Sequence, residues 1–162
     1  MINDLRINVL INKCVKERCG RKMKIFLICS KKFYYRIPEI EKELLKMGHV
    51  LQMPNCYDDP DTEEKMQKLG GKEHREFKAK MFKQSEDLIN GLDAVLVLNF
   101  DKEKDGVIYK NYIGGATFLE MYDAFRLGKK IYLWNPIPEG ILKDEIDGFD
   151  PIVINGDLNL LK

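Results

Sequence analysis

The stretch KIFLICS, residues 24–30, decides the fold class of this chain. Apolar residues follow one another from Ile25 to Cys29 without a charge, as in a strand that is buried on both faces of a sheet. The segment IPEIEKELLKMG, residues 37–48, then places its apolar side chains at helical spacing, with Pro38 in the first turn and Gly48 at the end. The two segments together predict one strand–helix unit.

The same alternation continues along the chain. Further strands are predicted at 49–55, 93–100, 130–135 and 151–155, and further helices at 72–91, from 114 to the glycine at 128, and at 141–146. Residues 101–110 are predicted to form a polar loop. Strands that alternate with helices indicate a parallel sheet covered on both faces. We therefore expect an α/β protein, a flavodoxin-like or Rossmann-like three-layer sandwich with a five-stranded parallel sheet.

Length and charge limit the organisation and the partners. The chain has 162 residues and 18.9 kDa, the size of one domain. Residues 1–22 differ in pattern from the rest of the chain and are interpreted as an N-terminal extension, so the domain is expected to span 23–162. Lys and Arg total 27 against 26 Asp and Glu, which gives a net charge of +1. This balance gives no indication of a nucleic-acid partner.

The cysteines and the hydropathy predict a cytoplasmic protein. The four cysteines are Cys14, Cys19, Cys29 and Cys56, and no apolar leader segment precedes them, so we expect reduced thiols. Cys14 and Cys19 have no second ligand pair nearby, which argues against zinc. No apolar run approaches the roughly 20 residues that a membrane-spanning helix needs, so no membrane partner is expected.

Ligands of an open α/β sheet bind beyond the carboxyl ends of its strands. The predicted strand ends carry the polar residues Ser30, Lys31, Asn55, Asn99, Asp101 and Asn135. The segment NYIGGATFLEMYDAF, residues 111–125, comes after the third strand and starts a helix at the same edge. These residues are the candidates for a functional site.

The glycines of this segment allow two interpretations. Gly114 and Gly115 remove side chains where a ligand could approach the free N–H groups of the helix, and Thr117 adds a hydroxyl, so a phosphate or an oxyanion would fit there. Alternatively, the two glycines only end a loop. Glu120, one turn later, is likewise either solvated on the outer face of the helix or directed into the crevice as a nucleophile or an acid–base group.

The residues DAVLVLNFD and GGATFLEMYDAFRLGKKIYLWNP, within 93–136, resemble the nucleoside 2-deoxyribosyltransferase superfamily, which includes the deoxynucleoside 5′-monophosphate N-glycosidases. The motif of that family is G-[ST]-x-x-E-x-G-x-A, and Thr117, Glu120 and Ala124 match it. Ala116 and Tyr122 stand at its two glycine positions. The order of the elements matches over about 23–154. Family members often have a tyrosine on the first strand, where this chain has Phe26.

The resemblance implies a mechanism and a set of residues. It implies that Glu120 is a nucleophile that attacks the anomeric carbon of a nucleoside or a nucleoside 5′-monophosphate, with Asp101 and Asn99 interacting with the leaving base. It also implies an acid in the helix before the third strand, for which Glu86 and Asp87 are candidates. No cofactor or metal is required. The substrate-binding candidates are Ser30, Lys31, Asn55, Asn111, Gly114, Gly115, Ala116 and Thr117.

The resemblance further implies a homodimer or a higher homo-oligomer, with Phe118, Met121, Tyr122 and Phe125 available for a helix-pair interface. The alternative function is a non-catalytic nucleotide-binding sensor or regulatory module, because a shared fold does not determine activity. Glu120 distinguishes the two, since a pure binder would not need a desolvated acid. A phosphoacceptor or flavin protein is disfavoured, because the first strand lacks a phosphate loop and an acidic cluster.

Overall fold

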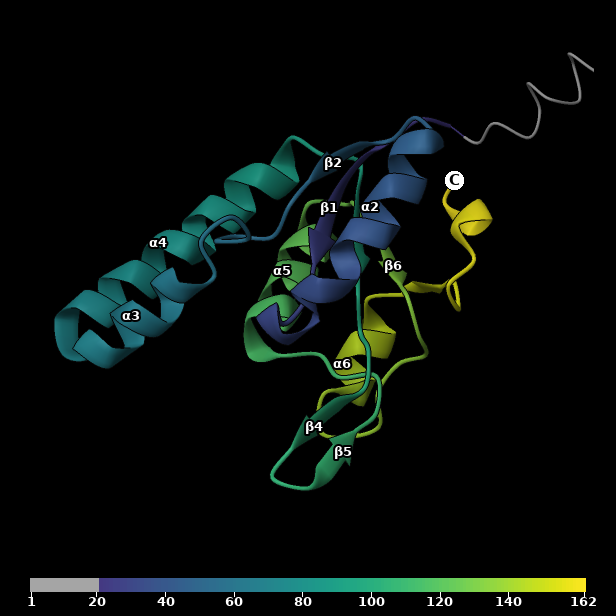
Figure 1. The fold of residues 1–162 in the computed structure, drawn as a ribbon. Helices are drawn as coiled ribbons and strands as arrows, with labels where there is room; N and C mark the ends of the chain where they lie inside the picture. Colours follow the sequence, from purple (N-terminus) through teal and green to yellow (C-terminus); the bar gives the residue numbers. More distant parts are fainter. Residues whose placement is uncertain (1–20) are drawn as a thin grey trace, which may run out of the picture.

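A computed structural model describes residues 21–162, so nearly all of the N-terminal extension expected at 1–22 lies outside the described residues. Five strands form one parallel sheet in the order β2-β1-β3-β6-β7 (Figure 1). They are β1 (Lys24–Ile28), β2 (Val50–Gln52), β3 (Ala94–Val97), β6 (Lys130–Leu133) and β7 (Ile152–Val153). This is the flavodoxin-like strand order, and the predicted fold class is confirmed.

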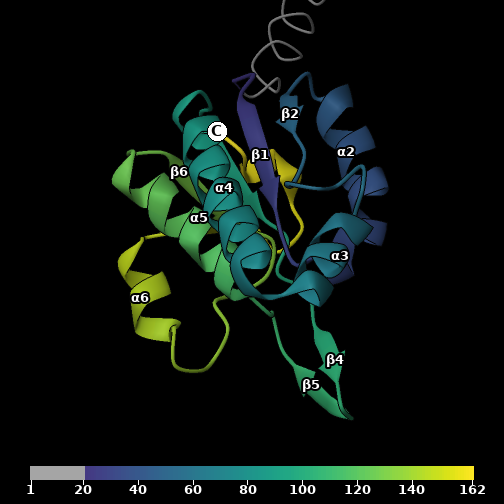
Figure 2. The ribbon, with the colours of Figure 1, turned by 90° about the vertical axis from the view of Figure 1, so that its left-hand side faces the viewer.

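Helices cover both faces of the sheet (Figure 2). The odd residues of β1, Ile25 and Leu27, pack with the 3-10 helix η1 (Lys31–Arg36) and α2 (Ile37–Lys46) on one face. The even residues, Phe26 and Ile28, pack with helices on the other face. These helices are α4 (Gly71–Asn90), α5 (Gly115–Arg126) and α6 (Lys143–Gly148). The central strands are therefore buried on both sides, as their continuous apolar sequences predict.

Two segments differ from the sequence expectations. The charged residues before Gly70 form a helix, α3 (Asp61–Leu69), which buries none of its own side chains and packs beside α4. The polar loop expected at 101–110 contains a hairpin of β4 (Lys102–Lys104) and β5 (Val107–Tyr109), which projects from the body (Figure 1). Asp105 and Gly106 both have positive φ, as a two-residue type I′ turn requires.

The remaining elements are short. The helix expected at 141–146 is displaced to 143–148, and the chain ends with the 3-10 helix η2 (Leu158–Leu160). His49 is buried at the amino end of β2 and accepts a hydrogen bond at Nδ1 from the backbone N–H of Met23. Between residues 21 and 162 no helix is long and apolar enough to cross a membrane.

Candidate active site

A cavity of about 390 Å³ lies at the carboxyl edge of the sheet. The ends of β1 and β2, the helices α3 and α4, and the start of α5 surround it. The structure brings most of the sequence-predicted site residues together here: Ser30, Lys31, Asn55, Gly114, Gly115, Ala116, Thr117 and Glu120 all line the cavity. This is the edge of the sheet at which ligands of parallel α/β sheets commonly bind.

Glu120 lies on α5 and is partly buried. Its Oε1 accepts a hydrogen bond of 2.9 Å from the Ser85 hydroxyl on α4. Burial raises the pKa of Glu120 to about 7, against the opposing effects of the Ser85 hydrogen bond and the Lys78 ammonium. Near neutral pH this carboxyl group therefore exists in both its protonated and its ionised forms, as acid–base and nucleophilic groups in active sites commonly do.

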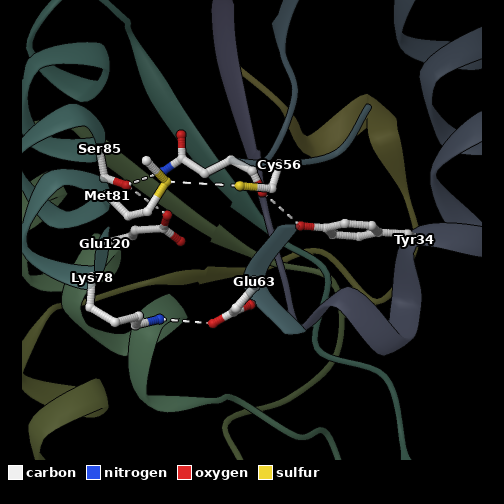
Figure 3. A network of polar contacts seen from close by, with 8 residues as sticks. Tyr34, Cys56, Glu63, Lys78, Met81, Ser85 and Glu120 are labelled. Atoms are coloured by element: carbon white, nitrogen blue, oxygen red, sulfur yellow. Dashed lines mark hydrogen bonds and ion pairs between the residues drawn. The ribbon is translucent and has the colours of Figure 1, made fainter. Parts of the chain in front are cut away.

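A chain of hydrogen bonds leads away from Glu120. Ser85, which is only 3% exposed, accepts a 2.6 Å hydrogen bond from the side-chain amide of Asn55. The backbone carbonyl of Asn55 accepts a 3.0 Å hydrogen bond from the Tyr34 hydroxyl. Figure 3 shows Ser85 beside Glu120 on one side of the cavity and Tyr34 on the opposite side. Residues from η1, from the end of β2, and from α4 and α5 are thus connected around the cavity.

The cavity combines cationic and apolar walls. Four lysines line it, namely Lys31, Lys32, Lys78 and Lys102. An apolar wall consists of Phe77, Met81 and Phe82 from α4 together with Cys56, whose Sγ lies 3.9 Å from Sδ of Met81. At the cavity wall, the ammonium of Lys78 contacts Glu63 of α3 at 2.9 Å (Figure 3). A small molecule with a flat apolar part and an anionic group would suit these walls.

The start of α5 is open to the cavity. Gly114 is the N-cap residue in an extended conformation, and Gly115 begins the helix. A Cβ atom added at Gly115 would meet nothing within 4 Å. Because residues 114–117 line the cavity, the first turn of the helix, where the free N–H groups and the helix dipole favour negative charge, is accessible to a ligand oxygen.

Four of the predicted residues, namely Asn99, Asp101, Asn111 and Asn135, lie outside the cavity. The side chain of Asn99 is fully buried, donates to the carbonyls of Asn135 and Pro136, and accepts from the Asn135 N–H. Asp101 is exposed at the base of the β4–β5 hairpin, where it pairs with Lys110 and accepts from the Asn111 N–H. Lys102, at the start of the hairpin, lines the cavity, whereas neither Asp101 nor Asn111 does.

The acid implied for α4 is absent from the cavity wall. Glu86 pairs with Arg126 at 2.5 Å, and Asp87 is exposed, whereas Ser85 faces Glu120. An α-helix turns by about 100° per residue, so a shift of one position turns a side chain away from the site. Lys78, Met81 and Ser85 follow one another at helical spacing and form the cavity wall on one face of α4.

Two further residues of the cavity were not singled out from the sequence as functional. Tyr34 on η1 brings a phenol hydroxyl to the cavity, although the first strand carries Phe26 where family members often have tyrosine. Cys29 comes directly after β1, and burial together with the nearby Glu120 raises the pKa of its thiol to about 12. The Cys29 thiol is therefore neutral over the physiological pH range.

The fold and the cavity define a doubly wound α/β protein with a small-molecule-sized cavity at the carboxyl edge of its sheet. Neither a protein-family model nor a curated protein matches the chain. Among solved structures, it is similar to a 2-deoxyribosyltransferase from the psychrotolerant bacterium Bacillus psychrosaccharolyticus, with 21% sequence identity and a TM-score of 0.49. The match covers 80% of this chain and 82% of that chain.

Proposed function

We propose that this protein is an enzyme that cleaves or transfers the N-glycosidic bond of a nucleoside, a deoxynucleoside or a nucleoside 5′-monophosphate, with Glu120 as the nucleophile. One observation carries the proposal: a partly buried carboxylate, held at one oxygen by Ser85, lines a cavity beside a helix N-terminus. Breaking an N-glycosidic bond develops positive charge at the anomeric carbon, and a carboxylate held against that carbon stabilises the charge.

The reaction then proceeds by the logic of retaining glycosidases. The free oxygen of Glu120 forms a bond to the anomeric carbon while the carbon–nitrogen bond breaks, and the base leaves with that electron pair and takes a proton from water. Attack by a water molecule releases the sugar and regenerates the carboxylate, which gives hydrolysis. Attack by a nitrogen of a second base gives transfer instead.

Two different parts of the cavity would bind the 5′-phosphate and the base of the substrate. A 5′-phosphate would accept hydrogen bonds from the N–H groups of residues 115–117, with Lys31 or Ser30 alongside. The base would contact the apolar wall on α4. Asn99 and Asp101 have no role toward the leaving base in this mechanism, because neither lines the cavity.

We also propose that the protein forms a homodimer through the outer face of α5. Leu119, Tyr122 and Phe125 on this face are 41–49% exposed. Phe149 stacks beside Phe125 with ring centroids 5.3 Å apart and extends the apolar surface. Met121, which the sequence suggested for the interface, is instead fully buried in the core.

The test is release of free base from a panel of nucleosides and nucleoside 5′-monophosphates, measured by liquid chromatography. The wild type is compared with Glu120→Gln, which keeps the shape of the side chain, and with Glu86→Gln, which removes a carboxylate that pairs with Arg126 outside the cavity. We expect release by the wild type and by Glu86→Gln, and a loss of at least about 1,000-fold in Glu120→Gln, because the amide cannot form the glycosyl intermediate.

The alternative, a nucleotide-binding sensor, gives a different result. A sensor would release no base, while nucleotides would still raise the melting temperature of both the wild type and Glu120→Gln. Base release that persists in Glu120→Gln would contradict the assignment of the nucleophile.

A further inference from the structure

Ser85 and Asn55 occupy one side of the nucleophile, and neither has a counterpart in the motif that the chain resembles. The two side chains come from different elements, since Asn55 lies just beyond β2 and Ser85 lies in the last turns of α4. Their contact of 2.6 Å and the contact of 2.9 Å between Ser85 and Glu120 form one continuous path.

The direction of the hydrogen bonds is set by the chemistry of the groups. The Asn55 side-chain nitrogen can donate but cannot accept, so it occupies a lone pair of the Ser85 oxygen. The single proton of the Ser85 hydroxyl then points to Oε1 of Glu120. An oxygen that receives this bond is held in place, and the other carboxylate oxygen, Oε2, has no hydrogen-bond partner among residues 21–162.

We propose that Ser85 and Asn55 are positioning residues that hold Oε1 of Glu120 and leave Oε2 free to attack the substrate. This inference rests on the proposed function for the identity of the reaction, but the hydrogen-bond path itself does not. Because Ser85 donates to Glu120, the path favours the ionised carboxylate over the protonated acid. It therefore opposes the burial of Glu120, which favours the neutral form.

Other titratable groups also surround Glu120, and most of them do not favour its ionised form as the Ser85 hydroxyl does. Cys29 from the end of β1 and Tyr34 from η1 are neutral near pH 7, and burial raises the pKa of each further above its usual value. Asp123, on the same helix, raises the pKa of Glu120 by its charge. Within residues 21–162, Lys78 on α4 is the one cation that lowers this pKa, and its ammonium contacts Glu63.

The experiment measures the pKa of Glu120 directly, by ¹³C NMR of the labelled side-chain carboxyl carbons, with Glu120→Gln to assign the signal. Ser85→Ala removes the hydroxyl, and we expect the pKa of Glu120 to rise by about one unit. Ser85→Thr retains a hydroxyl and is expected to leave the pKa within about 0.3 unit of the wild type. Circular dichroism establishes that each variant is folded.

A double-mutant cycle tests the connection through Asn55. Asn55→Leu removes the amide, so the Ser85 hydroxyl is free to turn and the pKa of Glu120 is expected to rise, though less than in Ser85→Ala. If the two residues act in series, the double variant has the same pKa as Ser85→Ala alone. If the two substitutions change the pKa of Glu120 additively, the proposed connection from Asn55 through Ser85 to Glu120 is wrong.

Activity provides the second readout. In Ser85→Ala the midpoint of the rise of kcat/KM with pH should shift to higher pH by as much as the pKa of Glu120 measured by NMR. The kcat should also fall at least about tenfold, even above this pKa, because the attacking oxygen is no longer oriented. An unchanged pKa in folded Ser85→Ala would refute the inference. A shifted pKa in a protein that releases no base would uphold the hydrogen-bond path and refute the proposed function.

Discussion

Replacing Glu120 by glutamine should stabilise the protein at alkaline pH. The pKa of Glu120 is raised from 4.5 in the unfolded chain to about 7 in the folded protein. The folded state therefore binds the proton more tightly, and stability falls as pH rises from about 4.5 through 7. The full difference corresponds to about 3 kcal/mol, since one pKa unit equals about 1.4 kcal/mol.

The stabilisation expected from Glu120→Gln is at most this pKa-derived value of about 3 kcal/mol. Glu120 is only partly buried, and glutamine brings an amide group that must itself be desolvated. We expect Glu120→Gln to raise the free energy of unfolding by roughly 1–3 kcal/mol at pH 8, and to raise Tm by about 2–4 °C for each kcal/mol. At pH 5 the difference should shrink to about a quarter of its value at pH 8, because the wild type has then lost little of its stability to the ionisation of Glu120.

Denaturant unfolding at pH 5 and pH 8 tests this expectation. His49, whose pKa burial lowers, has the opposite pH dependence but is present in both proteins, so it cancels in the difference. Glu86→Gln is the control, because the loss of its partly exposed pair with Arg126 should cost less than about 1 kcal/mol at both pH values. Equal stability of Glu120→Gln and wild type at pH 8 would refute the reasoning.

Three further outcomes are expected. The kcat/KM for base release should increase about tenfold per pH unit below pH 7 and level off above it, because in the proposed mechanism only the ionised Glu120 attacks; a pH-rate profile that is flat from 5 to 8 would contradict this. Gly115→Val, tested by isothermal calorimetry with a nucleotide, should fold normally but bind at least about tenfold more weakly, because its side chain fills the open space at the helix start. Asn99→Ala should lose about 2–4 kcal/mol of stability in denaturant unfolding, because it breaks three buried hydrogen bonds and leaves the Asn135 N–H unpaired.

Most of the fold could be predicted from the sequence, because its strands are buried on both faces. In a chain of this size, the continuous apolar runs at β1 and β3 can be buried only as central strands that are covered on both faces of the sheet. The β4–β5 hairpin was missed although Asp105 and Gly106 provide a turn signal, since the flanking strands are short and exposed. The helix α3 was missed because it has few apolar residues and buries none of its side chains, so its sequence reads as a charged segment.

The site could be predicted only in part. Residues at strand ends share an edge by topology, which is why Ser30 and Asn55 were identified together with Glu120. The direction of a side chain at a strand end depends on the next turn of the backbone. This is why Asn99 points into a buried contact with Asn135, and why Asp101 lies beside the hairpin instead of the cavity. The position of Ser85 depends on the rotation of α4, which the polar spacing of that helix leaves undetermined.

Helix α3 contributes to the cavity without contributing to the core. Glu63 and Gln67 of α3 line the cavity, yet none of the side chains of α3 is buried. Substitutions of exposed residues usually change stability by less than about 0.5 kcal/mol. Substitutions in this helix can therefore change the lining of the cavity while the sheet and its packing stay the same.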